Sequence, residues 1–443
     1  MSFARLVSSY GALLMRISRK LLTDLFFLVV LFVASGATEA LTMGSAGADP
    51  QGSPMMKVFW ACIYLVVILR LIPRYRQVLG LFRYNKCFAL LLLLAIYSTR
   101  WSVDPRLTLS KSLPLLLSAL IGLDFARRYS IGEQLRLVWM VLATVMVLGV
   151  IAQVFFPGVV PDLDFEPGGA WNGIVVNKNT WARLIVLTGI VLLSRPRPTR
   201  RSSVAFAMLM VMIMALLAAS RSAGGLLIMT TMLFVFGFSK VLHWRRATLI
   251  VLGSSLAALF ALAFSYVLQN LDQTTALLGK DATLTGRTPI WRETLRFVQK
   301  SPVWGYGFAA FWSQLSRPGR LVREAINWDN LPHSHNGYID LALQIGGVGL
   351  FLYFAAFFIG MRRAVRYTRR DPGRESMWPL AFLCVIFLYQ LDEGTIVTPN
   401  QLIWILYSAV LFSLVTIERS YKTALPPQEE DLVTHEPVLL AGD

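Results

Sequence analysis

The chain has 443 residues, of which 56% are hydrophobic and only 15% are charged, and this composition excludes an ordinary soluble protein. Apolar stretches as long as a bilayer is thick follow one another along almost the whole chain, so little sequence remains for a separate soluble domain. The net charge of +17 does not indicate nucleic acid, because a polytopic membrane protein needs basic cytoplasmic loops. We therefore predict no nucleic-acid partner.

The apolar stretches predict an all-α polytopic membrane protein with about twelve transmembrane helices. The predicted spans lie at approximately 24–41, 57–73, 86–99, 111–126, 135–156, 181–194, 203–219, 224–240, 247–267, 338–360, 378–394 and 401–417. If both termini are cytoplasmic, the inner segments carry most of the 42 Lys and Arg residues, as the positive-inside rule requires. A cleaved signal peptide is a competing interpretation of the first span, but the next spans need an anchor of the same orientation.

These spans divide the chain into four predicted parts. Residues 1–267 hold the first nine transmembrane helices, and residues 268–337 form one large outer loop that contains short helices. Residues 338–422 hold the last three spans. Residues 423–443 are polar and acidic, and we predict a disordered cytoplasmic tail.

Two short polar groups come first on the outer side. Asp162 and Asp164 are two residues apart, a spacing at which carboxylates hold the divalent cation of a sugar-diphosphate enzyme. The motif is common, and outward arginines can meet a diphosphate without metal, so we predict no metal site. The second group lies at the entrance to the sixth span and is predicted to bind substrate: Lys178, Asn179 and Arg183, next to Asn177.

A short turn between the seventh and eighth spans holds Arg221 at the outer membrane boundary. The turn is Ser220-Arg221-Ser222, with apolar stretches on both sides. A snorkelling arginine is one interpretation, but such residues are expected mainly on the cytoplasmic side. We favour an anion-binding role for Arg221.

The outer loop contains a predicted helix that begins at Pro289, is capped by Thr288 and runs to Ser301. Arg287 lies just ahead of its N-terminus, where a phosphate would meet free N–H groups and a bidentate guanidinium together. Binding to a loop carbonyl or a lipid phosphate is the alternative for Arg287.

The same helix has the pattern of a helix that lies in the membrane interface. Its predicted apolar face holds Trp291, Leu295 and Val298, and its basic face holds Arg292, Arg296 and Lys300. The basic face is predicted to meet headgroups or an anionic ligand, which makes Arg292 and Arg296 candidate substrate-binding residues.

Two of the four histidines, His333 and His335, lie two residues apart at the entrance to the tenth span. A neutral imidazole accepts a proton near pH 7, as a general base for a hydroxyl nucleophile must. Helix capping is an alternative role, and metal binding is another, although no third Cys or His lies nearby. Beyond Asn336 the helix is predicted to continue through Gly346, Gly347 and Gly349, which allow another helix backbone to approach closely.

Together these motifs resemble the O-antigen ligase and polysaccharide polymerase superfamily. The run 332–337, followed by Gly346 and Gly349, resembles its His-[Asn/Ser/Gln]-x9-Gly-x-x-Gly signature, with Asn336 at the second position. Thr285-Gly286-Arg287 with Trp291, and then Pro302 and Gly305-Tyr306-Gly307, resemble its outer-loop pattern, and Ser220-Arg221 resembles its intramembrane arginine. The runs Trp101-Ser102-Val103-Asp104-Pro105 and Val176-Asn177-Lys178-Asn179 are similar to the exopolysaccharide-polymerase branch.

The resemblance implies an inverting, metal-independent glycosyltransferase with a GT-C-like membrane fold and no cofactor. Its donor would be an undecaprenyl-diphosphate-linked glycan at the periplasmic side of the bacterial inner membrane. Arg221 and Arg287 would hold the diphosphate, and His335 would take the proton from the acceptor hydroxyl as it attacks the anomeric carbon. His333 and Asn336 would bind substrate beside it.

The resemblance leaves the acceptor open. A ligase transfers glycan to a lipid A core sugar, and a polymerase transfers it to another lipid-linked repeat; the runs at 101–105 and 176–179 favour the polymerase. A transporter or flippase of lipid-linked glycan is the alternative from another class. Transporters tend to have repeated halves and polar residues near the bilayer midplane, whereas the unusual charges here gather at the outer boundary. Sugar identity, oligomeric state and chain-length-control partners cannot be read from the sequence.

Overall fold

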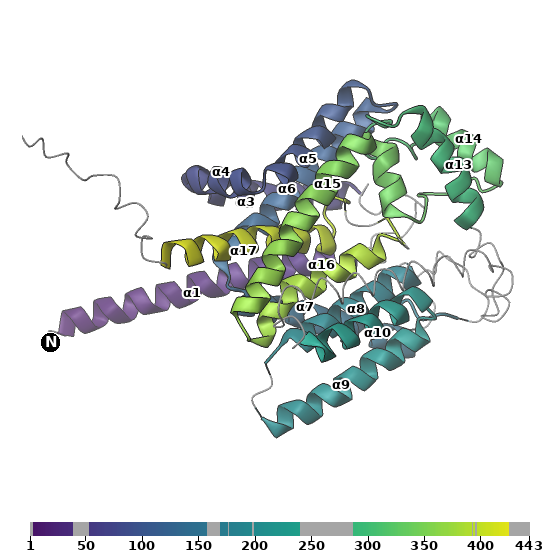
Figure 1. Ribbon diagram of the computed structural model, residues 1–443. Coiled ribbons are helices and arrows are strands. Elements are labelled where there is room, and N and C mark those ends of the chain that lie inside the picture. The colour runs from purple at the N-terminus through teal and green to yellow at the C-terminus, as the bar shows by residue number, and fades with distance from the viewer. Residues whose placement is uncertain are drawn as a thin grey trace, which may run out of the picture.

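The protein is all-helical in the residues that the computed structural model describes (Figure 1). These residues are 3–38, 53–156, 169–175, 177–196, 199–239, 287–391, 393–394 and 397–424. They contain helices, turns and loops, and no β-strand was found among them. The predicted ninth span, the Asp162-Leu163-Asp164 motif, Thr285, Gly286 and residues 425–443 lie outside the described residues, whereas residues 423 and 424 of the predicted tail are helical.

The helices follow one another in the order that the apolar pattern predicts. The α-helices are α1 (Phe3–Ala34), α3 (Pro54–Leu71), α4 (Tyr75–Tyr84), α5 (Lys86–Tyr97), α6 (Pro105–Arg128), α7 (Ile131–Phe155), α8 (Lys178–Ser194), α9 (Arg200–Ala219), α10 (Ala223–Gly237), α13 (Arg287–Lys300), α14 (Arg317–Ile326), α15 (Gly337–Arg370), α16 (Met377–Tyr389) and α17 (Leu402–Ala424). Short 3-10 turns, η2 (Ile72–Arg74), η3 (Ser98–Arg100) and η5 (Arg374–Ser376), join some of them.

Six helical stretches in the described residues are long and apolar enough to cross a membrane. They are Pro54–Tyr84, Pro105–Arg128, Ile131–Phe155, Arg200–Ala219, Gly337–Arg370 and Leu402–Tyr421. Every predicted span that lies within the described residues overlaps a helix, but α5, α8, α10 and α16 are not among these six stretches. The multi-pass architecture is confirmed, and the number twelve stays a prediction.

The most buried of the six stretches is α17, which packs along α6. A Cβ atom at Gly122 of α6 would lie 2.4 Å from the carbonyl oxygen of Ile405, so only glycine permits this approach. The indole of Trp404 donates a hydrogen bond to the carbonyl of Leu115 at 2.9 Å. This helix pair forms the centre of the bundle.

Helix α15 is broken near its start, which corrects the prediction of one continuous helix. Gly346 has φ +66°, and the segment 302–307 docks into the break. The N–H of Gly347 donates to the carbonyl of Pro302 at 2.7 Å, and the N–H of Tyr306 donates to the carbonyl of Leu343 at 2.8 Å. The glycines thus admit a loop rather than another helix, and α15 kinks because the loop takes over its backbone hydrogen bonds.

A second polar turn joins this region at the same end of the bundle. The N–H of Val103 donates to the carbonyl of Tyr306 at 3.0 Å, and the N–H of Phe308 donates to the hydroxyl of Ser98 at 3.0 Å. Figure 1 shows α13 and α14 beside the connection between α5 and α6. Segments that the charge pattern predicts to be on the outer side therefore contact one another.

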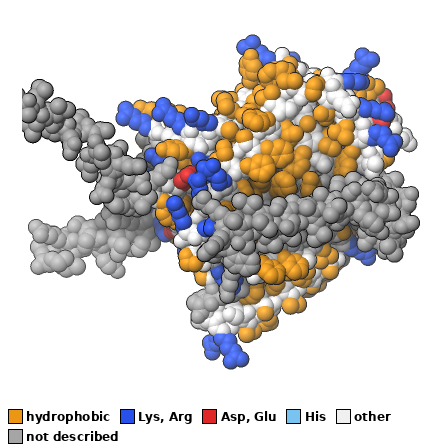
Figure 2. All heavy atoms as spheres, in the orientation of Figure 1, with side chains coloured by type: hydrophobic (Ala, Val, Ile, Leu, Met, Phe, Trp, Pro, Cys, Tyr) orange, Lys and Arg blue, Asp and Glu red, His pale blue; other side chains and the backbone are white. Residues whose placement is uncertain are grey.

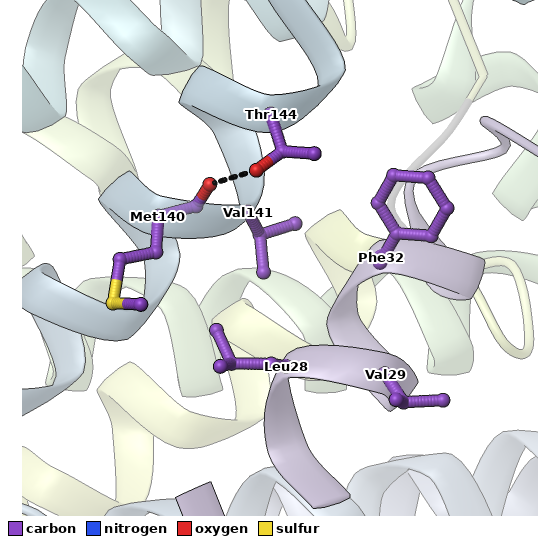
Figure 3. A pocket seen from close by; sticks show the side chains of 6 residues that line it. All are labelled: Leu28, Val29, Phe32, Met140, Val141 and Thr144. Carbon is purple, nitrogen blue, oxygen red and sulfur yellow. Dashed lines mark hydrogen bonds between the residues drawn. The ribbon is translucent and has the colours of Figure 1, made fainter. Parts of the chain in front are cut away.

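The surface and one pocket are apolar, as expected of a protein that contacts lipid. Figure 2 shows hydrophobic side chains across much of the described face, with Lys and Arg toward its margins. An apolar pocket of about 340 Å³ lies between α1 and α7, lined by Leu28, Val29, Phe32, Met140, Val141 and Thr144 (Figure 3). The hydroxyl of Thr144 donates to the carbonyl of Met140 at 2.9 Å. The lining includes no titratable side chain, so we assign no chemistry to this pocket.

The predicted topology leads to a direct test. Reporter fusions after Arg201 and after Arg370 are expected to read as cytoplasmic, and a fusion near Gly319 is expected to read as periplasmic, because basic segments stay inside. The measurement is paired reporter activity, with one reporter active only inside and the other only outside. An inside reading at Gly319 would contradict both the topology and chemistry at the outer face.

Candidate functional site

The candidate site is built around Glu393, a buried carboxylate in the loop that follows α16. Glu393 is only 6% exposed, and its N–H donates to the carbonyl of Tyr389 at the end of the helix at 2.8 Å. Five of the predicted site residues act on this carboxylate: Asn179, Arg183, Arg287, His333 and His335. The predicted residues from three separate segments are therefore brought together.

Each histidine faces a different oxygen of the same carboxylate. Nδ1 of His335 lies 3.5 Å from Oε1 of Glu393, and Nε2 of His333 lies 3.6 Å from Oε2. The N–H of His335 also donates to Nδ1 of His333 at 3.1 Å, and the two rings are 4.3 Å apart between centroids. The two imidazoles and the carboxylate thus form one electrostatic unit.

The backbone of the histidine loop is strained and is held from several sides. His335 has φ +54°, which non-glycine residues adopt only when their surroundings impose it. Next to it, the N–H of Ser334 donates to the carboxylate of Asp340 at 3.1 Å, and the indole of Trp291 donates to the carbonyl of Ser334 at 3.0 Å. The indole of Trp312 also donates to Asp340, at 2.9 Å. These bonds define where the His335 side chain lies.

The entrance of α8 contributes the predicted polar group. The side chain of Asn177 caps the helix by accepting from the N–H groups of Asn179 and Thr180. This orients Asn179, whose Nδ2 donates to Oε1 of Glu393 at 3.0 Å. Arg183 is buried one turn later, and its guanidinium donates to the hydroxyl of Thr180 at 3.0 Å. Lys178 is half-buried at the first position of the helix.

Arg287 reaches the same carboxylate from α13. Its guanidinium nitrogen lies 3.8 Å from Oε1 of Glu393, and about a fifth of its side chain is exposed. The prediction that the helix begins at Pro289 is wrong, because α13 already includes Arg287 and Thr288. Arg287 thus belongs to the first helical turn, where the N–H groups still favour an anion.

The predicted apolar face of α13 is confirmed only in part, because Trp291 and Val298 pack against a small core but Leu295 does not. The buried side chains are Ile290, Thr294 and Phe297, whereas Leu295 is exposed. Ile290 and Phe297 pack with Phe311, Val322, Leu331 and Leu343 in a small hydrophobic core of the outer segment. The helix therefore rests on protein, because α14 and the start of α15 offer it a better apolar partner than the membrane interface.

The basic face of α13 is exposed. Arg292 is exposed, and Arg296 is paired with Glu293 at 2.8 Å. The ammonium of Lys300 lies 4.5 Å from the ring centroid of Phe297. The substrate-binding role of Arg292 and Arg296 stays a prediction.

Arg221 lies in the short turn between α9 and α10, as predicted. It is exposed and has φ +52°, and Ser222 caps α10 by accepting from the N–H of Gly225 at 3.3 Å. Within the described segments, its guanidinium makes no hydrogen bond or ion pair with the Glu393 cluster. Helix α10 packs against α8 and α16, so Arg221 lies two residues ahead of a helix that adjoins both of these.

Asn336 is the N-cap of α15. Its side-chain oxygen accepts from the N–H groups of Tyr338 and Ile339 at 3.0 and 3.2 Å. The cap explains the amide at this position of the signature, because it satisfies two N–H groups at the helix start. Only its amide nitrogen is left to serve the predicted substrate-binding role.

Burial and the neighbouring charges together shift the pKa values of Glu393 and His333. Burial disfavours a charge on Glu393, but His335, His333 and Arg183 outweigh burial and lower the pKa of the carboxyl to about 2. Glu393 is therefore ionised at neutral pH. Burial lowers the pKa of His333 below its usual range, against the opposing effect of Glu393. This favours a neutral His333 imidazole beside a charged carboxylate.

Three side chains of the cluster also have the spacing of metal ligands. Donor atoms of His333, His335 and Glu393 all lie within 4.8 Å of one another. The same carboxylate already accepts from Asn179 and faces the guanidinium of Arg287, whose fixed charge opposes a second cation. The residues fit proton transfer better than metal binding, and we carry metal-free chemistry forward as a proposal.

The sequence reasoning missed Glu393 and Asp340. Glu393 falls at the end of a predicted transmembrane span, and a carboxylate at the outer end of an apolar helix was the signal that could have found it. Asp340 lies in the first turn of α15, where an acidic residue is also explained by the helix dipole. Asp340 lies six residues from its partner Ser334, whereas Glu393 is far in the sequence from His335 and Asn179.

One comparison with known proteins covers the part of the chain that holds Arg221, Arg287, His333 and His335, but not Asn179, Arg183 or Glu393. Residues 206–354 match the family described as O-Antigen ligase. The exopolysaccharide production protein ExoQ of Rhizobium meliloti (strain 1021) is 31% identical over 159 residues. That alignment covers 35% of this chain and 36% of the relative, so it spans little more than a third of either protein.

Proposed function

We propose that this chain is an inverting membrane glycosyltransferase, because residues 206–354 match the O-Antigen ligase family and part of the chain is similar to an exopolysaccharide production protein. It moves a glycan from undecaprenyl diphosphate to an acceptor sugar hydroxyl at the periplasmic face of the bacterial inner membrane. The observation that carries this proposal is the meeting of His335, Arg287 and Asn179 at one buried carboxylate. These residues supply a proton acceptor, an anion-binding group and an orienting amide at one place.

The reaction exchanges one bond at the anomeric carbon for another. The acceptor oxygen attacks that carbon from the face opposite the diphosphate, and the bond between the carbon and the diphosphate oxygen breaks. The hydroxyl proton moves to Nε2 of His335, and the electron pair of the broken bond leaves with the diphosphate. Attack from the opposite face inverts the configuration.

The arginines bind the donor and stabilise the leaving group. Arg287 lies at a helix start, where its guanidinium and nearby N–H groups suit a phosphate. Arg221 would contact the diphosphate from the turn before α10, and Arg183 and Lys178 add positive charge at the entrance of α8. The charge that develops on the departing diphosphate is thus met by fixed cations.

We propose the polymerase as the more specific activity. Its acceptor is another lipid-linked repeat, and the support is the similarity to a protein named for exopolysaccharide production. The alternative is an O-antigen ligase that uses a lipid A core acceptor, supported by the family description. The two activities share the donor chemistry and differ only in the acceptor.

The test is a transfer assay with the purified protein and a lipid-linked repeat in excess EDTA. Longer glycan on undecaprenyl diphosphate is the expected product, and turnover is expected to survive chelation because guanidinium groups replace a cation at the diphosphate. A second reaction contains lipid A core as the only added acceptor. The products are analysed by mass spectrometry.

Each outcome of the assay points to one activity. Product only on lipid A core would identify the ligase. Activity lost in EDTA and restored by magnesium or manganese would contradict metal-free catalysis and direct attention to Asp162 and Asp164. Glycan moved across a vesicle membrane without any new glycosidic bond would favour the transporter.

A further inference from the structure

We propose that Glu393 is the positioning residue of this site and that its two oxygens fix the protons of His333 and His335, so that Nε2 of His335 remains as the base. The inference rests on the proposed function and adds a residue to it. It follows from which ring atom faces which partner.

The proton of His333 is assigned by its neighbour. Its Nδ1 accepts the N–H of His335 at 3.1 Å, so Nδ1 carries no proton. In the neutral ring the proton is therefore on Nε2, the atom that lies 3.6 Å from Oε2 of Glu393. The carboxylate favours this tautomer because it accepts and cannot donate.

His335 takes the opposite tautomer. Its Nδ1 lies 3.5 Å from Oε1 of Glu393, so the carboxylate favours a proton on Nδ1. The lone pair is then on Nε2, where a hydroxyl proton can be received. Trp328 stacks on the ring with 5.9 Å between centroids and 26° between planes, which limits rotation of the imidazole. Hydrogen bonds between catalytic groups are often long in the absence of substrate and shorten when it binds, which accounts for the 3.5 Å distance.

The carboxylate is itself held in place. Asn179 donates to Oε1 at 3.0 Å, Arg287 approaches the same oxygen at 3.8 Å, and the side chain is buried. Because each oxygen faces one histidine, an amide cannot replace the carboxylate: its nitrogen would present a donor to one ring that already donates. Glu393→Gln therefore tests the proton assignment with almost no change in shape.

The charges around the two rings define the expected pH dependence. The titratable and charged groups that act on them are Glu393, Arg183, Arg287, Asp340 and the rings themselves. A carboxylate beside an imidazole favours the protonated ring. Removing the charge of Glu393 is therefore expected to move the acid limb of the pH–rate profile to lower pH.

The experiment compares the full-length wild type with Glu393→Gln and Glu393→Asp in the transfer assay. For Glu393→Gln, kcat is expected to fall at least about 10-fold with little change in the KM for donor, because the partner that orients the base is lost. Glu393→Asp is expected to retain more activity than Glu393→Gln. The matched control is Glu418→Gln, which removes a carboxylate paired with Arg363 at 2.8 Å and outside this site.

A second readout does not depend on turnover. Nitrogen-15 NMR of histidine-labelled protein reports tautomers, and the chain has only four histidines, which His333→Gln and His335→Gln would assign. The expected wild-type spectrum has one ring protonated at Nε2 and one at Nδ1, and Glu393→Gln is expected to lose this pair. Thermal melting of each variant shows that it is folded.

The two readouts separate the inference from the function on which it rests. Wild-type kcat, pH profile and tautomers in Glu393→Gln would overturn the role of Glu393, while an active wild type would leave the transferase intact. An inactive wild type would overturn the proposed function, and the tautomer spectrum would still decide whether Glu393 fixes the two protons.

Discussion

Replacing His335 with alanine is expected to reduce the rate of glycosyl transfer by about 100-fold to 10,000-fold, the usual contribution of a general base. Donor binding is expected to stay close to that of the wild type, because the imidazole acts on the proton of the acceptor. The measurement is donor affinity beside the initial rate for each purified variant. The same measurement on Arg287→Ala is expected to show weaker donor binding as well.

The control for this variant is His435→Ala, in the C-terminal tail outside the described residues. It removes an imidazole from the predicted tail, so its rate is expected to match the wild type. Arg287→Lys is expected to retain more donor binding and activity than Arg287→Ala but less than the wild type, because an ammonium lacks the planar two-point contact of a guanidinium. A wild-type rate in His335→Ala would show that this histidine is not the general base and would favour the transporter.

Replacing Gly346 with alanine is expected to destabilise the fold by about 3 kcal/mol or more. The new Cβ would lie 2.1 Å from the carbonyl oxygen of Val303, which is backbone and cannot turn aside. The residue also has φ +66°, where a side chain adds strain. The measurement is the melting temperature and yield of the purified variant in detergent.

The control for Gly346→Ala is Gly237→Ala at the end of α10. A Cβ at Gly237 would meet nothing within 4 Å, so the melting temperature is expected to stay near that of the wild type. Equal melting temperatures for both variants would show that the segment 302–307 is not docked in the break of α15.

The spans and the individual polar residues could be predicted because both are local signals. Apolar stretches placed α6, α7, α9 and α17 close to where they lie, and polar residues against an apolar background drew attention to Asn179, Arg221 and His335. Each of these signals can be read from a stretch of sequence about as long as one helix.

The assembly of the site could not be predicted in the same way. Glu393 lies 58 residues from His335 and 214 residues from Asn179 in the chain, and no local pattern encodes such pairings. The break in α15 was also missed, because Gly346, Gly347 and Gly349 in an apolar stretch are equally typical of tight helix packing. Which side chains of α13 are fully buried depends on a small core built from α13, α14 and α15, so helical periodicity alone identified Trp291 and Val298 but missed Ile290 and Phe297.

That small core has a mechanical consequence. The segments that carry Arg287 and His335 belong to a unit with its own apolar interior, and the non-helical residues at 345–346 separate the start of α15 from its membrane part. Glu393 and Asn179, by contrast, come from the ends of α16 and α8, in the main bundle. The contact between Glu393 and His335 therefore joins the outer segment to the main bundle. If His335 is the base, its alignment with Glu393 depends on how the outer segment packs on the main bundle.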